Sequence, residues 1–567
     1  MKIFKNIYTY IIGVLFTLII SFLVYITYKG TCYNAIQYTS EYTFFLKDNV
    51  LLNILFSVLF IVFILFLSKS KLVRKINNDD KLFKKLQIIL LTLIFIVGAV
   101  WVWGVEILPE SDQYFVLKAV AEFKNGDYSS FENGAYMEMC TNQIGIFFIY
   151  YLLSFILGDN FYLGLQIVNV LAVVLIYKSL SDIAGILKGS NFIRLAIIFS
   201  AFVFPVLIIY CWLIYGNMLG IAFILLSIKY ELIYFDKYKI KDLLLSSLFL
   251  IVALMAKSFT LVYLIGMSIY AFFKILDTKN VKGILTIICF ILGLLFELYA
   301  PKLYVESKVG HSLNGASYYS YIAMGMQDGD RCEGWHNKYN QDSYHLANND
   351  SNLHKEISLK EINERLSVFS KDSAYALKFY SRKIISQWNN PTFGMYYGMD
   401  SLTNDEFMYR FGDGYDHSKY FDRFLNLGFE SHVQSILNVE QSLIVLGSLF
   451  YIIFFFFRKE RSLEELVLPL CFIGGFLFLI IWEAKAQYAL MFYVILFIYA
   501  LFGYKELIDA LNKHINVDRK KIIITLAIGL VLTITYNFLF NKEYLYNDNT
   551  RYREYLACGN TYDWFNK

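Results

Sequence analysis

The stretch LQIILLTLIFIVGAVWVWGVEILPESDQY, residues 86–114, decides the fold of this chain. It joins an apolar run that is long enough to cross a bilayer to three carboxylates, Glu106, Glu110 and Asp112. Carboxylates this close to a bilayer lose hydration and are costly to keep, so they indicate a functional site. The alternative is that they only mark the membrane boundary.

The composition of the whole chain agrees with a membrane protein. Of 567 residues, 57% are hydrophobic and 17% are charged, and the mean hydropathy is +0.49. A water-soluble fold cannot bury that much apolar surface, so the bilayer must be its solvent. The net charge of +4 is small and spread among loops, which argues against nucleic acid as a partner. The sequence therefore predicts an all-α polytopic membrane protein.

About thirteen apolar segments are long enough, or nearly so, to span the membrane. Their approximate bounds are Tyr8–Tyr28, Val50–Ser68, Leu86–Leu108, Phe161–Tyr177, Phe192–Leu213, Leu219–Phe235, Leu243–Ala256, Phe259–Phe273, Ile284–Ala300, Ser442–Phe457, Leu466–Trp482, Tyr488–Phe502 and Ile522–Phe540.

The distribution of basic loops decides whether one further apolar run, Asn142–Leu157, crosses the membrane. It reaches only ~24 Å, against a hydrocarbon core of ~30 Å. The short Lys/Arg-rich loops fall on one side of the membrane only if this run does not cross, and the positive-inside rule puts those loops in the cytoplasm. We therefore expect an interfacial half-helix, a plasma-membrane protein with a cytoplasmic N-terminus, and the Asp112 loop on the extracytoplasmic face.

This topology predicts four parts. Residues 1–85 hold two additional helices and a basic cytoplasmic loop, and residues 86–300 form a membrane module with the outer loop 109–160. Residues 301–440 form a small, mainly helical extracytoplasmic module, and residues 441–567 form the last helices and an outer tail. Periodicity predicts helices around Ile357–Phe369 and Ser373–Trp388. Two interpretations of Trp335 and Trp388 stay open, stacking on a sugar ring and anchoring at the interface.

Four outer segments together resemble the GT-C glycosyltransferases, a superfamily that includes protein mannosyltransferases and aminoarabinose transferases. They are the acidic segment with the short helix after Ser111, the interface helix that opens at Asn142-Gln143, the turn Tyr215-Gly-Asn217, and Glu483-Ala-Lys-Ala-Gln-Tyr488. The chain departs from that pattern where many members carry an Asp, here Asn217, and where a late Arg is replaced by Gln487. The resemblance implies a GT-C-like bundle with interfacial helices in the first outer loop.

The resemblance implies that a sugar is transferred from a polyprenyl-phosphate donor to an extracytoplasmic acceptor, a surface glycan or cell-wall polymer. The residues fit the needs of that reaction, which are a base for the acceptor hydroxyl and charge stabilisation at the departing phosphate. Asp112 is the expected base. Glu110 has three open roles, which are to orient Asp112, to share its proton, or to join it in holding a divalent cation. No metal site is assigned, because two carboxylates alone supply few of the oxygen ligands that a divalent cation needs.

Lys257 and Lys485 are the cations expected at the donor phosphate, although Lys485 could instead form a salt bridge with Glu483. The remaining candidates share a place on the predicted outer face, and we expect them to bind substrate: Tyr114, Gln143, Tyr215, Asn217, Trp335, Trp388, Glu483 and Tyr488.

Two other function classes remain open. One is a lipid-linked glycan polymerase or ligase, which would use the same outer geometry. The other is a non-enzymatic transporter or flippase of a lipid-linked glycan, which needs charged residues along a path through the membrane. The predicted spans are nearly free of charge, and the sequence has no Walker motif, Gly-x-Ser-x-Gly elbow or evident transporter-type repeat. These features favour chemistry at one face over passage.

Overall fold

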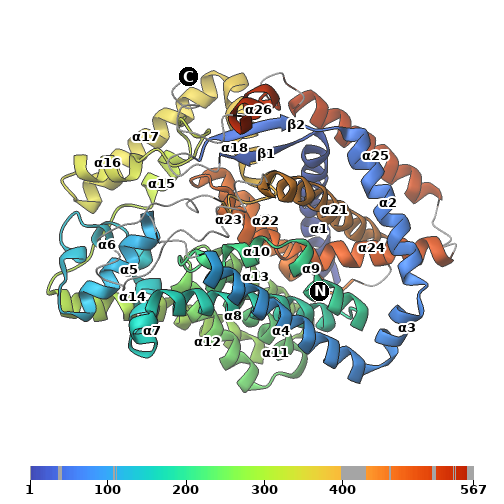
Figure 1. Cartoon of the computed structure of the whole chain (residues 1–567), viewed down its shortest axis with the longest axis horizontal. Helices are drawn as coiled ribbons and strands as arrows, with labels where there is room; N and C mark the ends of the chain where they lie inside the picture. Colours follow the sequence, from blue (N-terminus) through green and yellow to red (C-terminus); the bar gives the residue numbers. More distant parts are fainter. Residues whose placement is uncertain are drawn as a thin grey trace.

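The computed structural model describes residues 2–35, 41–105, 109, 111–396, 429–458, 461–513, 519–540, 542 and 545–557. Long helices dominate these residues, as the sequence predicts (Figure 1). The helices of the membrane bundle are α1 (Lys2–Lys29), α2 (Val50–Ser68), α4 (Asp80–Val105), α8 (Phe161–Ile186), α9 (Asn191–Val203), α11 (Asn217–Lys237), α12 (Ile240–Ala256), α13 (Thr260–Thr278), α14 (Ile284–Val309), α21 (Phe429–Phe457), α22 (Val467–Ile481), α23 (Ala486–Tyr493), α24 (Leu496–Lys513) and α25 (Arg519–Phe540).

The predicted number of about thirteen spans is the upper limit that the structure allows, and that limit counts the bent pair ending at Leu157 as a span. By length and composition, 10 helices within the described ranges can cross a membrane, and up to 13 can if each of three bent helix pairs is one span. The bends are 98° between Ser129–Met139 and Thr141–Leu157, 55° between Asn191–Val203 and Val206–Trp212, and 51° between Ala486–Tyr493 and Leu496–Asn512. The chain is therefore a multi-pass membrane protein.

The 55° bend has a local cause that matters for the site. Helix α9 stops at Val203 because Phe204 precedes Pro205, and the residue before a proline avoids helical geometry. A short helix, α10 (Val206–Ile209), and a 3₁₀ turn, Tyr210–Trp212, follow at a new angle. The bend leads the chain into the turn that carries Tyr215.

The half-helix prediction rests on α7 (Ile144–Leu157), which has 14 residues and follows the sharpest of the three bends. It packs against α5 (Ser111–Lys124), α12 and α14. The short helix α6 (Tyr136–Met139) lies between α5 and α7 in the chain. That α7 does not cross the membrane, and that the Asp112 loop lies outside, stay predictions.

The expectation of an all-α fold is wrong in one place. An antiparallel hairpin, β1 (Gly30–Asn34) and β2 (Thr43–Lys47), stands between α1 and α2, with Cys32 opposite Phe45. Both strands are short and rich in Thr and aromatic residues, which favour a pleated surface over a helix. Cys32 N–H donates to Asn389 O at 2.9 Å, which ties the hairpin to the 301–440 segment.

The predicted module beyond α14 is mainly helical where it is described. Its helices are α15 (Tyr319–Met324), α16 (Tyr339–Leu346), α17 (Ser351–Lys371) and α18 (Ser373–Trp388), so both helices predicted from periodicity are confirmed. Asp350 and Asp372 cap α17 and α18. In Figure 1 these helices, the hairpin and α26 (Asn549–Ala557) lie along the upper edge of the molecule. The short helix α3 (Lys71–Asn78) packs on α4 and α9.

The first helix is not peripheral to the bundle. Helix α1 packs along α21 and against α22, and Tyr536 OH of α25 donates to Leu18 O at 2.9 Å. Because β1 and β2 follow α1 directly, this packing fixes the position of the hairpin over the bundle.

Candidate active site

A cavity at one end of the helix bundle opens to solvent, and about 660 Å³ of space lies between its walls when that open solvent is included. Its wall is built by six chain segments, which are the hairpin, the start of α5, the turn after α10, the loop before α16, the end of the 301–396 segment and the start of α23. Five predicted site residues line it, namely Asp112, Tyr215, Trp335, Lys485 and Tyr488. Sequence positions far apart therefore meet at one place.

Asp112 and Glu41 are the two acidic residues that line this space. Asp112 is the one without an ion pair among the described residues. It stands in the first turn of α5, after Ser111 at φ 51°, and its side chain is exposed. Among the described residues, no hydrogen bond or ion pair occupies its carboxylate. The adjacent Gln113 is buried and its Oε1 accepts from Ile214 N–H at 3.0 Å, which holds α5 against the Tyr215 turn. A carboxyl group without a described partner is thus presented to the cavity from a fixed helix.

Tyr215 forms another part of the wall and is held by its neighbours. Its hydroxyl accepts from Gln143 Nε2 at 2.6 Å, and the following Gly216 N–H donates to the hydroxyl of Tyr150 at 3.2 Å. Burial, with the charge of Asp112, raises the pKa of Tyr215 well above its usual value, so the ring stays neutral. Gln143 is therefore a residue that positions Tyr215 and does not itself line the cavity.

The tight turn at Gly216 requires glycine for two reasons. Its φ is +77°, and a Cβ there would lie 1.9 Å from Ala256 O. We expect Gly216→Ala to destabilise the fold by about 2–3 kcal/mol, since backbone strain and overlap with a backbone atom add. Gly126→Ala is the matched control, because Gly126 has φ +78° with no atom within 4 Å. Thermal unfolding of the two purified variants checks this, and equal losses would contradict the account.

Lys257 lies directly behind Tyr215, at the end of α12 as predicted. Its Nζ is 3.7 Å from the centre of the Tyr215 ring and donates to Tyr215 O at 3.4 Å. Burial lowers the pKa of Lys257 to about 7, and the charge of Lys485 adds to this, while Asp112 and Glu483 oppose it. This lysine can therefore exchange a proton near neutral pH, close to Asp112.

Lys485 is paired, but with a residue that the sequence did not indicate. Its Nζ lies 3.0 Å from Glu41 Oε1, and Arg331 Nη1 lies 2.5 Å from the other carboxylate oxygen. Glu41 is buried, so desolvation would raise its pKa, but Lys485 and Arg331 outweigh this and lower it. The expected alternative, a salt bridge between Lys485 and Glu483, is thus replaced by one with the hairpin.

Glu483 and Lys383 form a second, buried layer. Burial raises the pKa of Glu483 to about 7, although Lys485 opposes the shift. Burial lowers the pKa of Lys383 to about 7 against the opposing charge of Glu483, and Lys383 Nζ donates to Gly325 O. Neither group lines the cavity, but Glu483 interacts electrostatically with both Lys383 and Lys485.

The other predicted residues divide into two groups. Tyr488 lines the cavity and contacts the Phe259 ring edge-on at 4.4 Å, and Trp335 lines it while its Nε1 donates to Ser386 Oγ at 2.8 Å. Tyr114, Asn217 and Trp388 are buried and do not line it. Trp388 packs against Phe472 and Phe476, so neither stacking on a sugar nor anchoring at an interface fits its position.

Glu110 and Glu106 lie outside the described residues. Within the described ranges, no three His, Cys, Asp or Glu side chains are grouped so that they could hold a metal ion. The site as described is therefore one open carboxylate in a cavity lined by Lys485 and aromatic rings, with Lys257 and Arg331 behind this lining.

Sequence reasoning missed Glu41, Arg331 and His336. His336 lies near Arg331 and Lys485, and burial together with these cations lowers its pKa. The rule that singled out Asp112, a carboxylate close to an apolar run, applies equally to Glu41, between α1 and α2. No signal in the sequence points to Arg331, because its role depends on the hairpin.

No protein-family model matches the chain, and no curated protein matches it. What the site does must therefore be argued from its own groups.

Proposed function

We propose that this protein is a membrane glycosyltransferase that moves a sugar from a polyprenyl-phosphate donor to an extracytoplasmic glycan or cell-wall acceptor. The observation that carries the proposal is the open carboxylate of Asp112, which faces a cavity lined by Tyr215, Tyr488 and Lys485. A sugar phosphate already has a competent leaving group, so a base and phosphate-binding cations are the main requirements.

In this mechanism Asp112 accepts the proton of the acceptor hydroxyl as that oxygen attacks the anomeric carbon. The bond from that carbon to the phosphate oxygen breaks, and the negative charge passes to the lipid phosphate. Lys485 supplies positive charge in the cavity wall beside Glu41, and Lys257 supplies it from behind Tyr215. The rings of Tyr215 and Tyr488 provide faces on which a sugar can stack, whereas Trp335, which is only 1% exposed, supports the cavity wall.

The proposal is tested with the purified protein in liposomes that contain radiolabelled polyprenyl-phosphate sugars and candidate acceptors. We expect label to leave the lipid and to appear in an acceptor. Label that reaches the other leaflet on an unchanged lipid would instead assign a flippase. Label that assembles into chains on a lipid carrier would assign a polymerase.

Donor affinity should fall as the pH rises through about 7. Lys257 is protonated below its pKa of about 7, and Glu483 ionises above a pKa of about 7. Both changes remove positive charge from the site, so KM for the anionic donor should increase from about pH 6 to about pH 9. Lys257→Arg keeps its charge throughout and should flatten this rise. A KM profile that is the same in both proteins would contradict the assignment of Lys257.

A further inference from the structure

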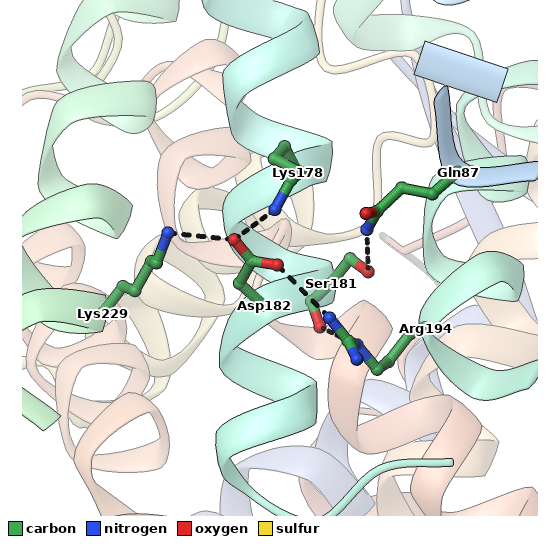
Figure 2. A network of polar contacts seen from close by, with 6 residues as sticks. All are labelled: Gln87, Lys178, Ser181, Asp182, Arg194 and Lys229. Carbon is green, nitrogen blue, oxygen red and sulfur yellow. Dashed lines mark hydrogen bonds and ion pairs between the residues drawn. The ribbon is translucent and has the colours of Figure 1, made fainter. Parts of the chain in front are cut away.

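A second charged cluster lies at the other end of the bundle from the cavity. Figure 2 shows the carboxylate of Asp182 on α8 with Lys178 from the same helix, Lys229 from α11 and Arg194 from α9. Lys178 Nζ and Lys229 Nζ lie 2.5 Å and 2.9 Å from Asp182 Oδ2, and Arg194 Nη2 lies 3.4 Å from Oδ1.

Helix geometry separates this cluster from the candidate active site. Helix α11 begins at the Gly216 turn beside the cavity, and Lys229 lies ~18 Å farther along the helix axis. Helix α8 gives the same separation. Its Asn169 Nδ2 donates to Leu213 O in the wall of the cavity, and Asp182 lies ~20 Å from Asn169 along the helix axis. The Asp182 cluster is therefore a separate site on the opposite membrane face.

The cluster carries more positive charge than its own acid neutralises. Three cations meet one carboxylate, and no other carboxylate among the described residues lies within ion-pair distance of them. The side chains of Asp182, Lys229 and Arg194 are only 12%, 19% and 22% exposed, and that of Lys178 is 37% exposed. Positive charge that is partly removed from water and not fully neutralised is costly, so a bound anion would stabilise it.

The cations are held in place. Arg194 Nε donates to Ser181 O at 3.2 Å, and its guanidinium lies 4.4 Å from the centre of the Phe83 ring. Gln87 on α4 donates to Ser181 Oγ at 3.5 Å, so four helices support the arrangement (Figure 2). Each lysine uses one of its three donors on Asp182, which leaves donors for a second anion.

The depth of the cluster indicates the kind of anion. Asp182 lies about one helical turn before α8 ends at Ile186, and Arg194 lies about one turn after α9 begins at Asn191. Lys178 and Lys229 lie about two turns inside the ends of α8 and α11, from where their long side chains can extend toward the lipid headgroups. Basic pockets between membrane helices near the headgroup region suit anionic headgroups, and Lys and Arg suit phosphate.

We propose that the cluster of Lys178, Arg194 and Lys229 binds the phosphate group of an anionic phospholipid at the membrane face opposite the candidate active site. A free phosphate ion shares this chemistry. The lipid is favoured because the long side chains of the cluster can extend toward the headgroups from among apolar helices.

The test uses the full-length protein in detergent, titrated with phosphatidylglycerol, phosphatidylcholine or inorganic phosphate. Thermal unfolding and native mass spectrometry are the measurements. We expect phosphatidylglycerol, but not the other two, to raise Tm and to remain bound. Lys178→Gln and Lys229→Gln should each weaken its apparent affinity about fivefold. Lys241→Gln is the matched control, because this exposed lysine at the start of α12 lies outside the cluster, and it should leave the affinity unchanged.

A second variant separates lipid binding from a purely structural role. Asp182→Asn leaves three cations without their carboxylate, so the stabilisation by phosphatidylglycerol should increase. Equal stabilisation of wild type by phosphatidylcholine, or no change in lipid affinity in Lys178→Gln and Lys229→Gln, would overturn the proposal. An equal shift with inorganic phosphate would reassign the cluster to a free phosphate ion.

Discussion

Asp112→Asn is expected to lower the rate of sugar transfer about 10²–10⁴-fold while the protein remains folded. The amide keeps the shape of the side chain but cannot accept the proton of the acceptor hydroxyl. Little structural change is expected, because the side chain is exposed to the cavity and has no hydrogen bond or ion pair among the described residues. Initial rates at saturating donor, normalised to folded protein, measure the effect.

Glu132→Gln is the matched control for that experiment. Glu132 is an exposed acid in the same segment between α4 and α7, and it does not line the cavity. It should transfer sugar at the wild-type rate. A comparable loss of rate in both variants would mean that overall charge, and not a base at Asp112, controls the reaction.

Glu41→Gln is expected to reduce the free energy of unfolding by on the order of 2–3 kcal/mol. The substitution leaves Arg331 and Lys485 next to a neutral amide, although both cations are about a quarter exposed, which moderates the cost. The hairpin should then be held less firmly over the cavity. Chemical denaturation in detergent measures the change.

The pH dependence of stability is a second test of the ion pairs that Glu41 forms with Arg331 and Lys485. The pKa of Glu41 is lowered in the folded protein, so its contribution is complete above the unfolded value of ~4.3 and is lost as the pH falls through the folded value. Glu364→Gln is the control, because Glu364 is 61% exposed and its pairing with Lys360 is weak. It should not change stability, and an equal effect in both variants would contradict the role of Glu41.

Much of the site could be predicted because membrane topology is strongly encoded. Asp112, Lys257 and Lys485 each stand at the end of an apolar run, and such runs fix which end of the bundle a residue occupies. Once the helix ends are placed, these residues meet at one end without any knowledge of helix packing.

The rest could not be predicted, for identifiable physical reasons. The pairing of Lys485 with Glu41 depends on the path of a hairpin that has no strong turn signal in the described residues. The bounds of α18 were predicted correctly, but the partner of each face was not, so Trp388 was assigned to substrate although it packs on α22. Periodicity gives a helix and its apolar face, whereas the neighbour of that face is decided by tertiary packing.

The most direct test of the central claim measures donor binding and sugar transfer on the same preparation of Asp112→Asn. If Asp112 is the base, the variant should bind the polyprenyl-phosphate sugar with wild-type affinity, because Lys257 and Lys485 remain, and should transfer little of it. If binding and transfer are both retained, Asp112 is not the base. If both are lost in a folded protein, Asp112 acts in donor binding, and the proposed division of roles between the carboxylate and the lysines is wrong.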